Sequence, residues 1–200
     1  MATKLSIPNN NPKKILGIAA LIVGAIILTF FIIWLYRILT LDKRNCKRMN
    51  RMYSEFPLIK SFNPNNEDFS HNLRDYYVKT AYNCCAPGNY KNSFVNLCAL
   101  KNCIKEGVRC LDFQIYALNN DPVIAVSSVS DFNTKQSFNS IPFGDAISII
   151  DNFAFSGNKC PNPGDPLILH FRIYSQNKEI MDKMSDSISS TLEDRVLGPT

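Results

Sequence analysis

The chain begins with one uninterrupted apolar run, and patterned polar sequence follows it. Between Lys14 and Arg37 lie 22 uncharged residues, numbered 15–36. At about 1.5 Å rise per residue, a helix of this length spans about 33 Å, against a hydrocarbon core of about 30 Å. Trp34 and Tyr36 stand at its end, where aromatic rings favour the membrane interface. A cleaved signal peptide would be shorter and would end in small residues, so the run predicts a single-pass transmembrane helix.

The rest of the chain alternates between strand-like and helix-like patterns. After a short tail (1–14) and the apolar run, residues 37–74 are interpreted as a basic juxtamembrane segment and a linker broken by Pro57 and Pro64. Strands alternating with helices then predict an α/β domain over 75–200 with about four parallel strands. The strands are expected at 75–83, 109–118, 123–128 and 166–175, and the helices at 89–107 (with Gly107 as the stop), 143–155 and 178–192.

Positive charge is concentrated around the apolar run. Residues 1–51 carry a net charge of +8 and the remainder a net charge of −3, which excludes a basic globular surface for nucleic acid. Six basic residues follow the run and three precede it, so the C-terminal domain is predicted to face the cytosol. The absence of an N-x-[ST] sequon agrees with this orientation. Seven cysteines without scaffold-like spacing suit a reducing compartment and predict buried free thiols.

A basic cluster directly after the run is a candidate lipid-binding segment. Each basic residue there could contribute about 1 kcal/mol toward anionic head groups. The alternative is that the cluster only determines the topology of the anchor. Cys46 lies in the same stretch and is a weak candidate for palmitoylation. The predicted lipid-binding residues are Lys43, Arg44, Lys47, Arg48 and Arg51.

Five stretches of the predicted domain resemble, in order and spacing, motifs of one enzyme family. They are DYYVKTAYN (75–83), the helix end at Cys98–Gly107 followed by VRCLD (108–112), DPVI (121–124), the stretch 137–155 and DPLIL (165–169). The family is the X region of phosphatidylinositol-specific phospholipase C, and the resemblance covers about residues 74–197. It implies the first half of a (β/α)8 TIM barrel, with the site at the carboxyl ends of the strands.

The resemblance also implies a chemistry and a set of site residues. Members of the family cleave a phosphodiester by attack of the inositol 2-hydroxyl, helped by two histidines, and many hold Ca²⁺ with Asn, Glu and Asp side chains. The two histidines fall on Tyr82 and Ser128 of this sequence. The metal ligands fall, in chain order, on Asn83, Asp112, Gln114 and Arg172.

These replacements predict a phosphodiesterase fold without its catalytic set. Tyrosine and serine do not replace imidazole near neutral pH. Like charges at 4 Å cost about 4 kcal/mol per unit-charge pair, so Ca²⁺ beside Arg172 is disfavoured. We therefore expect no cofactor, no metal and no catalysis by the family mechanism, with Arg172 replacing the ion and pairing with Asp112. The alternative is a shifted strand in which Arg172 faces solvent. His170 is a displaced base or, more simply, a hydrogen-bonded strand residue.

Three functions remain open from the sequence. The chain has 22 Asn and 21 Ile, which suggests an AT-rich genome, and similar PLC-like chains occur in large DNA viruses by family resemblance. The first hypothesis is therefore a virion structural or docking protein, a pseudoenzyme that links an internal membrane to the capsid. The second is a phosphoinositide head-group binder without turnover. The third is an active phosphodiesterase with rearranged catalytic residues. The expected partners are the lipid bilayer, anionic phospholipid and a capsid or scaffold protein, and not nucleic acid.

Overall fold

A computed structural model of the chain describes residues 12–54, 58, 61, 65, 71–129 and 135–197. The chain divides after Thr40 into two compact units. Pro57, Pro64 and most of the predicted tail 1–14 lie outside the described residues.

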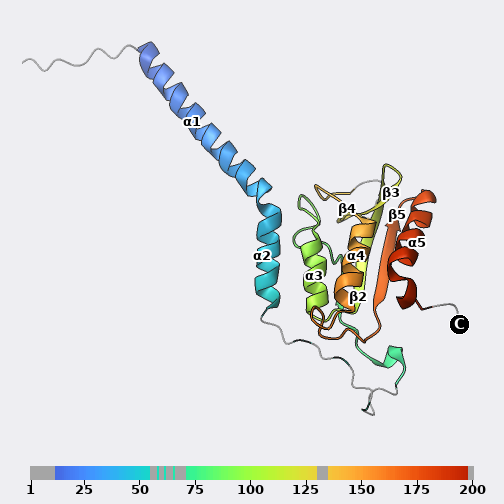
Figure 1. Ribbon diagram of the computed structural model, residues 1–200. Helices are drawn as coiled ribbons and strands as arrows, with labels where there is room; N and C mark the ends of the chain where they lie inside the picture. The colour runs from blue at the N-terminus through green and yellow to red at the C-terminus, as the bar shows by residue number, and fades with distance from the viewer. Residues whose placement is uncertain are drawn as a thin grey trace, which may run out of the picture. The chain divides into compact units, whose positions relative to one another are not determined.

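The first unit contains helix α1 (Pro12–Leu39), which includes the whole predicted apolar run. Its mean hydropathy is 2.9 over the most apolar window, and none of its residues is buried. The helix drawn in dark blue in Figure 1 is long and apolar enough to cross a membrane.

The second unit begins with a helix that the sequence analysis did not predict. Helix α2 (Leu41–Tyr53) occupies the first part of the stretch interpreted as a basic segment and linker, and that interpretation was wrong for these residues. One face of α2 packs on the domain, because Asp42, Asn45, Cys46 and Met49 recur at helical spacing and are half-buried. The five basic residues of the predicted lipid-binding segment are all exposed, and four of them, Lys43, Arg44, Lys47 and Arg51, lie on the opposite face.

A mixed sheet forms the centre of the domain. Strand β2 (Cys110–Leu118) lies between its parallel partner β5 (Ile168–Tyr174) on one side and β1 and β3 on the other. The strands β1 (Thr80–Ala81), β3 (Asp121–Ile124) and β4 (Ile141–Pro142) are short. The predicted strands 75–83 and 123–128 were therefore only partly right, and β4 was not predicted.

The prediction of an all-parallel sheet is wrong for β3. Asn119 and Asn120 join β2 to β3, and both have positive φ, 51° and 63°. Two such residues form the tight turn of a hairpin, whereas parallel strands need a long crossover connection. Strand β3 therefore pairs antiparallel with β2, and β4 pairs antiparallel with β3. The α/β class itself is confirmed.

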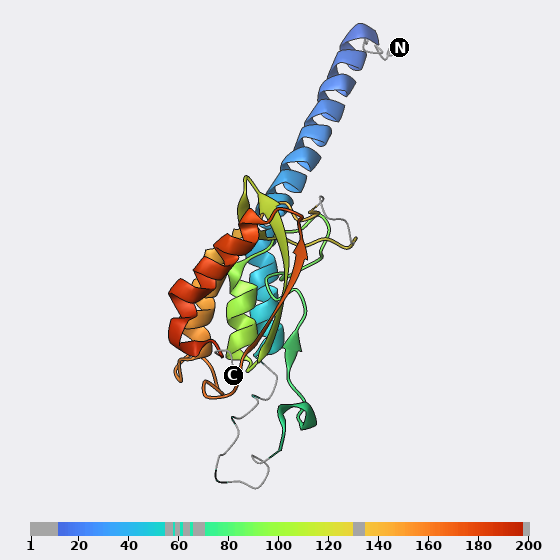
Figure 2. The ribbon, with the colours of Figure 1, turned by 90° about the vertical axis from the view of Figure 1, so that its right-hand side faces the viewer.

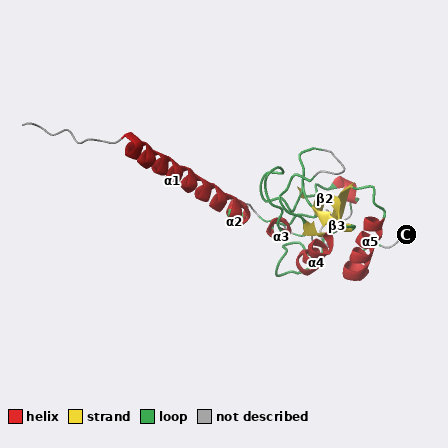
Figure 3. Cartoon of the chain, turned by 90° about the horizontal axis from the view of Figure 1, so that it is seen from above, coloured by secondary structure: helices red, strands yellow, loops and turns green. Residues whose placement is uncertain are grey.

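Three helices cover one face of this sheet. They are α3 (Leu97–Lys105), α4 (Phe143–Ala154) and α5 (Glu179–Leu192), and Figures 2 and 3 show them on the same side of the strands. Alternate β2 side chains, Leu111, Phe113 and Ile115, are buried in the core with the apolar sides of these helices. The intervening side chains, Asp112 and Gln114, therefore point to the opposite face of the sheet. Two short 3-10 helices, η2 (Leu73–Asp75) and η3 (Glu193–Arg195), complete the described elements.

Helix α3 is shorter than the predicted helix 89–107 because local chemistry fixes both of its ends. The side chain of Asn96 accepts a hydrogen bond from the Cys98 amide at 2.7 Å and so caps the first turn. Gly107, predicted as the stop, has φ 75° and follows the last turn. Residues 89–96 precede the cap and are not helical.

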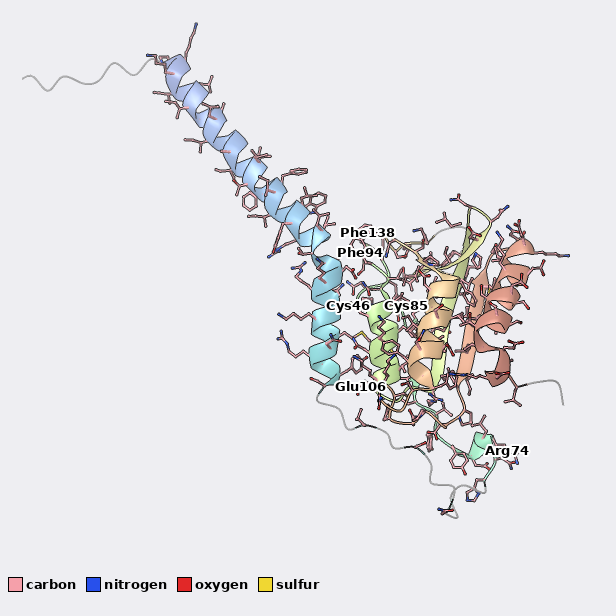
Figure 4. The ribbon with its side chains drawn as sticks, in the orientation of Figure 1. Cys46, Arg74, Cys85, Phe94, Glu106 and Phe138 are labelled. Atoms are coloured by element: carbon pink, nitrogen blue, oxygen red, sulfur yellow. A yellow bond between two sulfur atoms is a disulfide. The ribbon has the colours of Figure 1, made fainter. Side chains whose placement is uncertain are left out.

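A disulfide between Cys46 and Cys98 joins α2 to α3 (Figure 4). The expectation of free thiols is thus wrong for these two residues, and Cys46 is not free for palmitoylation. The pairing was missed because the sequence does not show that α2 packs on α3, and connectivity cannot be deduced from spacing alone. The remaining thiols are free, as predicted: Cys110 is half-buried, and Cys84, Cys85, Cys103 and Cys160 are buried.

Candidate functional site

Strands β2 and β5 bring four polar side chains together on the face away from the helices. Their parallel register places Asp112 opposite His170 and Gln114 opposite Arg172. Alternation along a strand puts both pairs on one face of the sheet. Asp112 is 4% exposed and Gln114 is 3% exposed. Both therefore need hydrogen-bond partners within the protein.

Arg172 is held by a complete set of acceptors. Its Nε donates to Asp112 Oδ2 at 2.9 Å, and its Nη2 donates to Asp112 Oδ1 at 2.6 Å. Nη2 also donates to Asn83 Oδ1 at 2.6 Å, and Nη1 donates to the hydroxyls of Tyr82 at 2.8 Å and Tyr174 at 3.5 Å. A guanidinium has five N–H donors, so every donor has an acceptor. The predicted pairing with Asp112 is confirmed, and the alternative in which Arg172 faces solvent is wrong.

Contacts within the cluster keep Asp112 and Arg172 ionised. The Arg172 cluster is defined here as Tyr82, Asn83, Asp112, His170 and Arg172. Burial alone would raise the pKa of Asp112, but hydrogen bonds from Arg172, the Asn83 amide and His170 outweigh it and hold that pKa below the ordinary value. Burial opposes the charge of Arg172 as well, and the bond to Asp112 reverses this and raises its pKa. Both partners are therefore ionised at neutral pH. The Tyr82 ring adds a cation–π contact 4.2 Å from the guanidinium carbon.

His170 is the feature that sequence reasoning underestimated. Its Nδ1 lies 2.7 Å from Asp112 Oδ2, and its side chain is 59% exposed. Because Asp112 is ionised, Nδ1 must be the donor, which leaves Nε2 as a proton acceptor when the ring is neutral. The sequence carried a signal for this contact. His170 precedes Arg172 by two residues, so the two share one face of the strand.

Two of the predicted site positions serve other contacts. Gln114 binds the backbone of Ser127, accepting from its amide at 2.7 Å and donating to its carbonyl at 3.3 Å. The Ser128 hydroxyl donates to Gln136 Oε1 at 2.6 Å. Tyr82, Asn83, Asp112 and Arg172 thus come together, whereas Gln114 and Ser128 hold the segment after β3.

The residues of the Arg172 cluster do not fit a calcium ion. Asp112 is the only carboxylate in the cluster, and N–H groups of Arg172, Asn83 and His170 occupy its oxygens. Calcium takes six to eight oxygen ligands, and the guanidinium repels a cation. Within the described residues, no group of three or more His, Cys, Asp or Glu side chains could hold a metal ion.

Comparisons with known proteins agree with this fold. The family model for the phosphatidylinositol-specific phospholipase C X domain matches residues 69–200. The structure also resembles the crystal structures of PLC21 from L. pealei and S. officinalis, each with a TM-score of 0.52, at 16% and 15% sequence identity. Each match covers 64% of this chain and only 15% of the solved chain. No curated protein matches the chain.

The fold is that of a PLC-like domain, and an apolar helix precedes it in the chain. Because the family model matches more than half of the chain, the protein belongs to the phosphatidylinositol-specific phospholipase C X-domain family. The resemblance stated from five sequence stretches is therefore confirmed. The solved structures share too little sequence identity to show more than the fold.

Proposed function

We propose that this protein is a membrane-anchored, catalytically inactive PLC-like domain that acts as a structural or docking protein. The observation that carries the proposal is the Arg172 guanidinium, which donates to both Asp112 and Asn83. The resemblance to the family assigns the sequence position of Arg172 to a metal ligand. A fixed cation there supplies the positive charge that stabilises the buried carboxylate. The cluster then acts as a structural element of the sheet.

The lack of imidazole at both family positions supports inactivity. Tyr82 contacts Arg172 with its hydroxyl, and Ser128 contacts Gln136. Imidazole is the side chain suited to proton transfer near neutral pH, and neither tyrosine nor serine provides one. General acid–base catalysis commonly contributes about 10²–10⁴-fold to a rate, so its loss removes much of the family's activity.

The location of the protein is part of the proposal. Helix α1 supports a single membrane span, and the excess of basic residues on its C-terminal side supports a cytosolic domain. On an internal membrane of a virion, that face would meet the capsid or a scaffold. Few disulfides persist in the cytosol. The Cys46–Cys98 disulfide is therefore unusual for a cytosolic domain, and the side of the membrane on which the domain lies has to be measured to test the proposal.

The docking role predicts a fixed ratio between this protein and one partner. In purified native particles, quantitative mass spectrometry is expected to find copy numbers proportional to those of a capsid or scaffold protein. Cross-links from lysines of residues 41–197 to that partner are expected in intact particles and absent after the membrane is separated. Protease added to sealed membranes is expected to remove the domain on the cytosolic side. A domain that resists protease in sealed membranes would contradict the role. Intact particles that show no cross-link from the domain to a capsid or scaffold protein would contradict it as well.

A second candidate function is a phosphodiesterase with rearranged catalytic groups, and the His170–Asp112 pair favours it. The 2.7 Å contact fixes the imidazole, and the His170 side chain is largely exposed on the same face of the sheet as Arg172. A carboxylate that orients a histidine is the arrangement of a general base.

One assay separates the two functions. Purified full-length protein is incubated with phosphatidylinositol vesicles, and released inositol phosphate is measured with calcium and with a chelator. The docking proposal predicts no release above that of a matched His170→Gln variant in either condition. Release by the wild type that falls at least about 10²-fold in His170→Gln would establish the second candidate instead. His71 supplies the control, since His71→Gln removes a histidine outside the cluster.

A third possibility, head-group binding without turnover, finds support in helix α2. Its five basic residues lie at positions i, i+1, i+4, i+5 and i+8, so they form one exposed stripe. Such a stripe attracts an anionic surface, but it does not by itself select a ligand.

A further inference from the structure

A cleft of about 350 Å³ lies between α2 and the loop 86–93, and none of the Arg172 cluster lines it. Both walls belong to the second unit, so the cleft is a property of the domain alone. It divides the basic residues of α2 into two groups. Arg48 lines the cleft, whereas Lys43, Arg44, Lys47 and Arg51 do not.

Covalent and polar contacts fix the α2 wall. The disulfide Cys46–Cys98 is one attachment, and Asp42 accepts two hydrogen bonds from Asn96 Nδ2 at 2.9 and 2.8 Å. Asn45 Nδ2 donates to Ser93 Oγ at 3.3 Å across the back of the cleft. These contacts hold α2 at a set distance from the loop, so the cleft is preformed.

The loop wall is fixed as well. Its ends are held by the Ala86 amide, which donates to the Asn83 carbonyl at 2.8 Å, and by the Asn92 amide, which donates to the Gln136 carbonyl at 3.2 Å. Gly88 stands where a Cβ atom would meet Asn45 Nδ2 at 2.5 Å and Ser93 Oγ at 3.0 Å. A side chain at this position would therefore require the side chains of Asn45 and Ser93 to shift, and with them the hydrogen bond between the two walls.

The lining has the chemistry of a phosphate-ester site. Among the residues that the structure describes, Arg48 is the only charged residue of the lining, and no carboxylate lines the cleft. Amide and hydroxyl groups come from Asn45, Asn89, Asn92 and Ser93, which can donate to anionic oxygens. The rest is mostly apolar and suits the hydrocarbon next to a head group. It comprises Leu41, Met49, Met52, Tyr53, Ala86 and Pro87.

We propose that this cleft binds the phosphate ester of an amphiphilic anion, with Arg48 as the charged contact. A phospholipid head group and a soluble phosphate ester share this chemistry. The lipid source rests on the membrane anchoring proposed above, and the reach of the chain supports it. Arg48 follows Leu39 by nine residues, so it lies within about 30 Å of the end of α1 even for a fully extended chain.

The test compares two charge-matched variants of the full-length protein in non-ionic detergent. Dihexanoyl-phosphatidylinositol and glycerophosphoinositol are titrated separately, and binding is measured by calorimetry. Arg48→Gln is expected to weaken binding of the short-chain lipid about tenfold or more, because it removes a charge-assisted hydrogen bond. Lys47→Gln removes the same charge one residue away, outside the cleft, and is expected to change the affinity less than about twofold.

Each outcome decides the proposal. Equal weakening by the two variants would show diffuse electrostatic attraction and overturn it, as would no binding of either probe. Equal affinity for the lipid and glycerophosphoinositol would support the site and assign it to a soluble ester. Because these measurements require no turnover and no docking partner, their failure leaves the proposed function intact. Inositol phosphate release would overturn the proposed function and leave the cleft untouched.

Discussion

Replacing Arg172 by glutamate is expected to make the stability of the domain depend on calcium. The variant puts a second carboxylate beside Asp112 and Asn83, where the guanidinium now lies. Without metal, removal of one partner of a buried pair costs about 3–5 kcal/mol, and the upper part of that range applies only where the pair is fully desolvated. Arg172 retains 21% exposure, so we expect a loss near the lower end. Calcium at about 100 times its dissociation constant would restore about 2.7 kcal/mol.

The matched control is Arg172→Gln, which loses the ion pair and gains no carboxylate. Its free energy of unfolding, measured by urea denaturation in detergent, is expected to fall less than that of the metal-free Glu variant, because no second carboxylate repels Asp112. It is expected to stay unchanged when calcium is added. Calcium is expected to leave the wild type unchanged as well. If millimolar calcium leaves the free energy of unfolding of the Glu variant unchanged, the result contradicts the assignment of Arg172 to a former metal position.

The same pair predicts how stability responds to acid. The pKa of Asp112 in the folded protein lies below its ordinary value of 3.8. The stabilisation is therefore fully present above the unfolded pKa, and it is lost as the pH falls through the lower folded value. In the Arg172→Gln variant the acid limb of the stability profile is expected to be shallower below about pH 4, because the folded and unfolded pKa values are closer.

Breaking the Cys46–Cys98 disulfide is expected to lower the free energy of unfolding by up to about 4 kcal/mol. The bond closes a loop across a sequence separation of 52, and the chain-entropy account gives that magnitude for such a loop. Cys46→Ser is the test, and Cys110→Ser, which alters a free thiol in β2, is the matched control. Urea denaturation measures the stability.

Hydrogen exchange gives a second readout for the same variants. Amides of α2 are expected to lose protection in Cys46→Ser, since the contacts of Asp42, Asn45 and the partly buried Met49 with the domain are noncovalent. The sheet amides are expected to keep their order of protection. If α2 stays protected and the stability is unchanged, those noncovalent contacts hold the helix by themselves.

Periodicity within one element made several features predictable. The apolar run predicted α1, and helical spacing predicted α4 and α5 to within a few residues. The order of five short motifs predicted the family. The loss of both family histidines, and an arginine in place of a carboxylate, predicted the Asp112–Arg172 pair before any geometry was known. Each of these predictions rests either on periodicity within one segment or on a short motif shared with the family.

Other features depend on contacts between segments far apart in the chain. Helix α2 has an amphipathic pattern in the sequence. The disulfide could not be inferred from that pattern, because Cys98 lies 52 residues after Cys46 and in another helix. Strand β1 is only two residues long, because pairing with β2 and not local propensity decides where the ladder ends. The contact of His170 with Asp112 required the register of two parallel strands.

By itself the sequence determined the apolar helix, the family and the identity of the side chains on one face of two strands, because these follow from local periodicity and residue chemistry. The tertiary structure alone decided that Asn83, Asp112, His170 and Arg172 meet, that β3 turns back antiparallel, and that α2 closes a cleft against the loop 86–93. The physical reason is that strand register, burial and disulfide pairing depend on distances between segments that no local pattern contains.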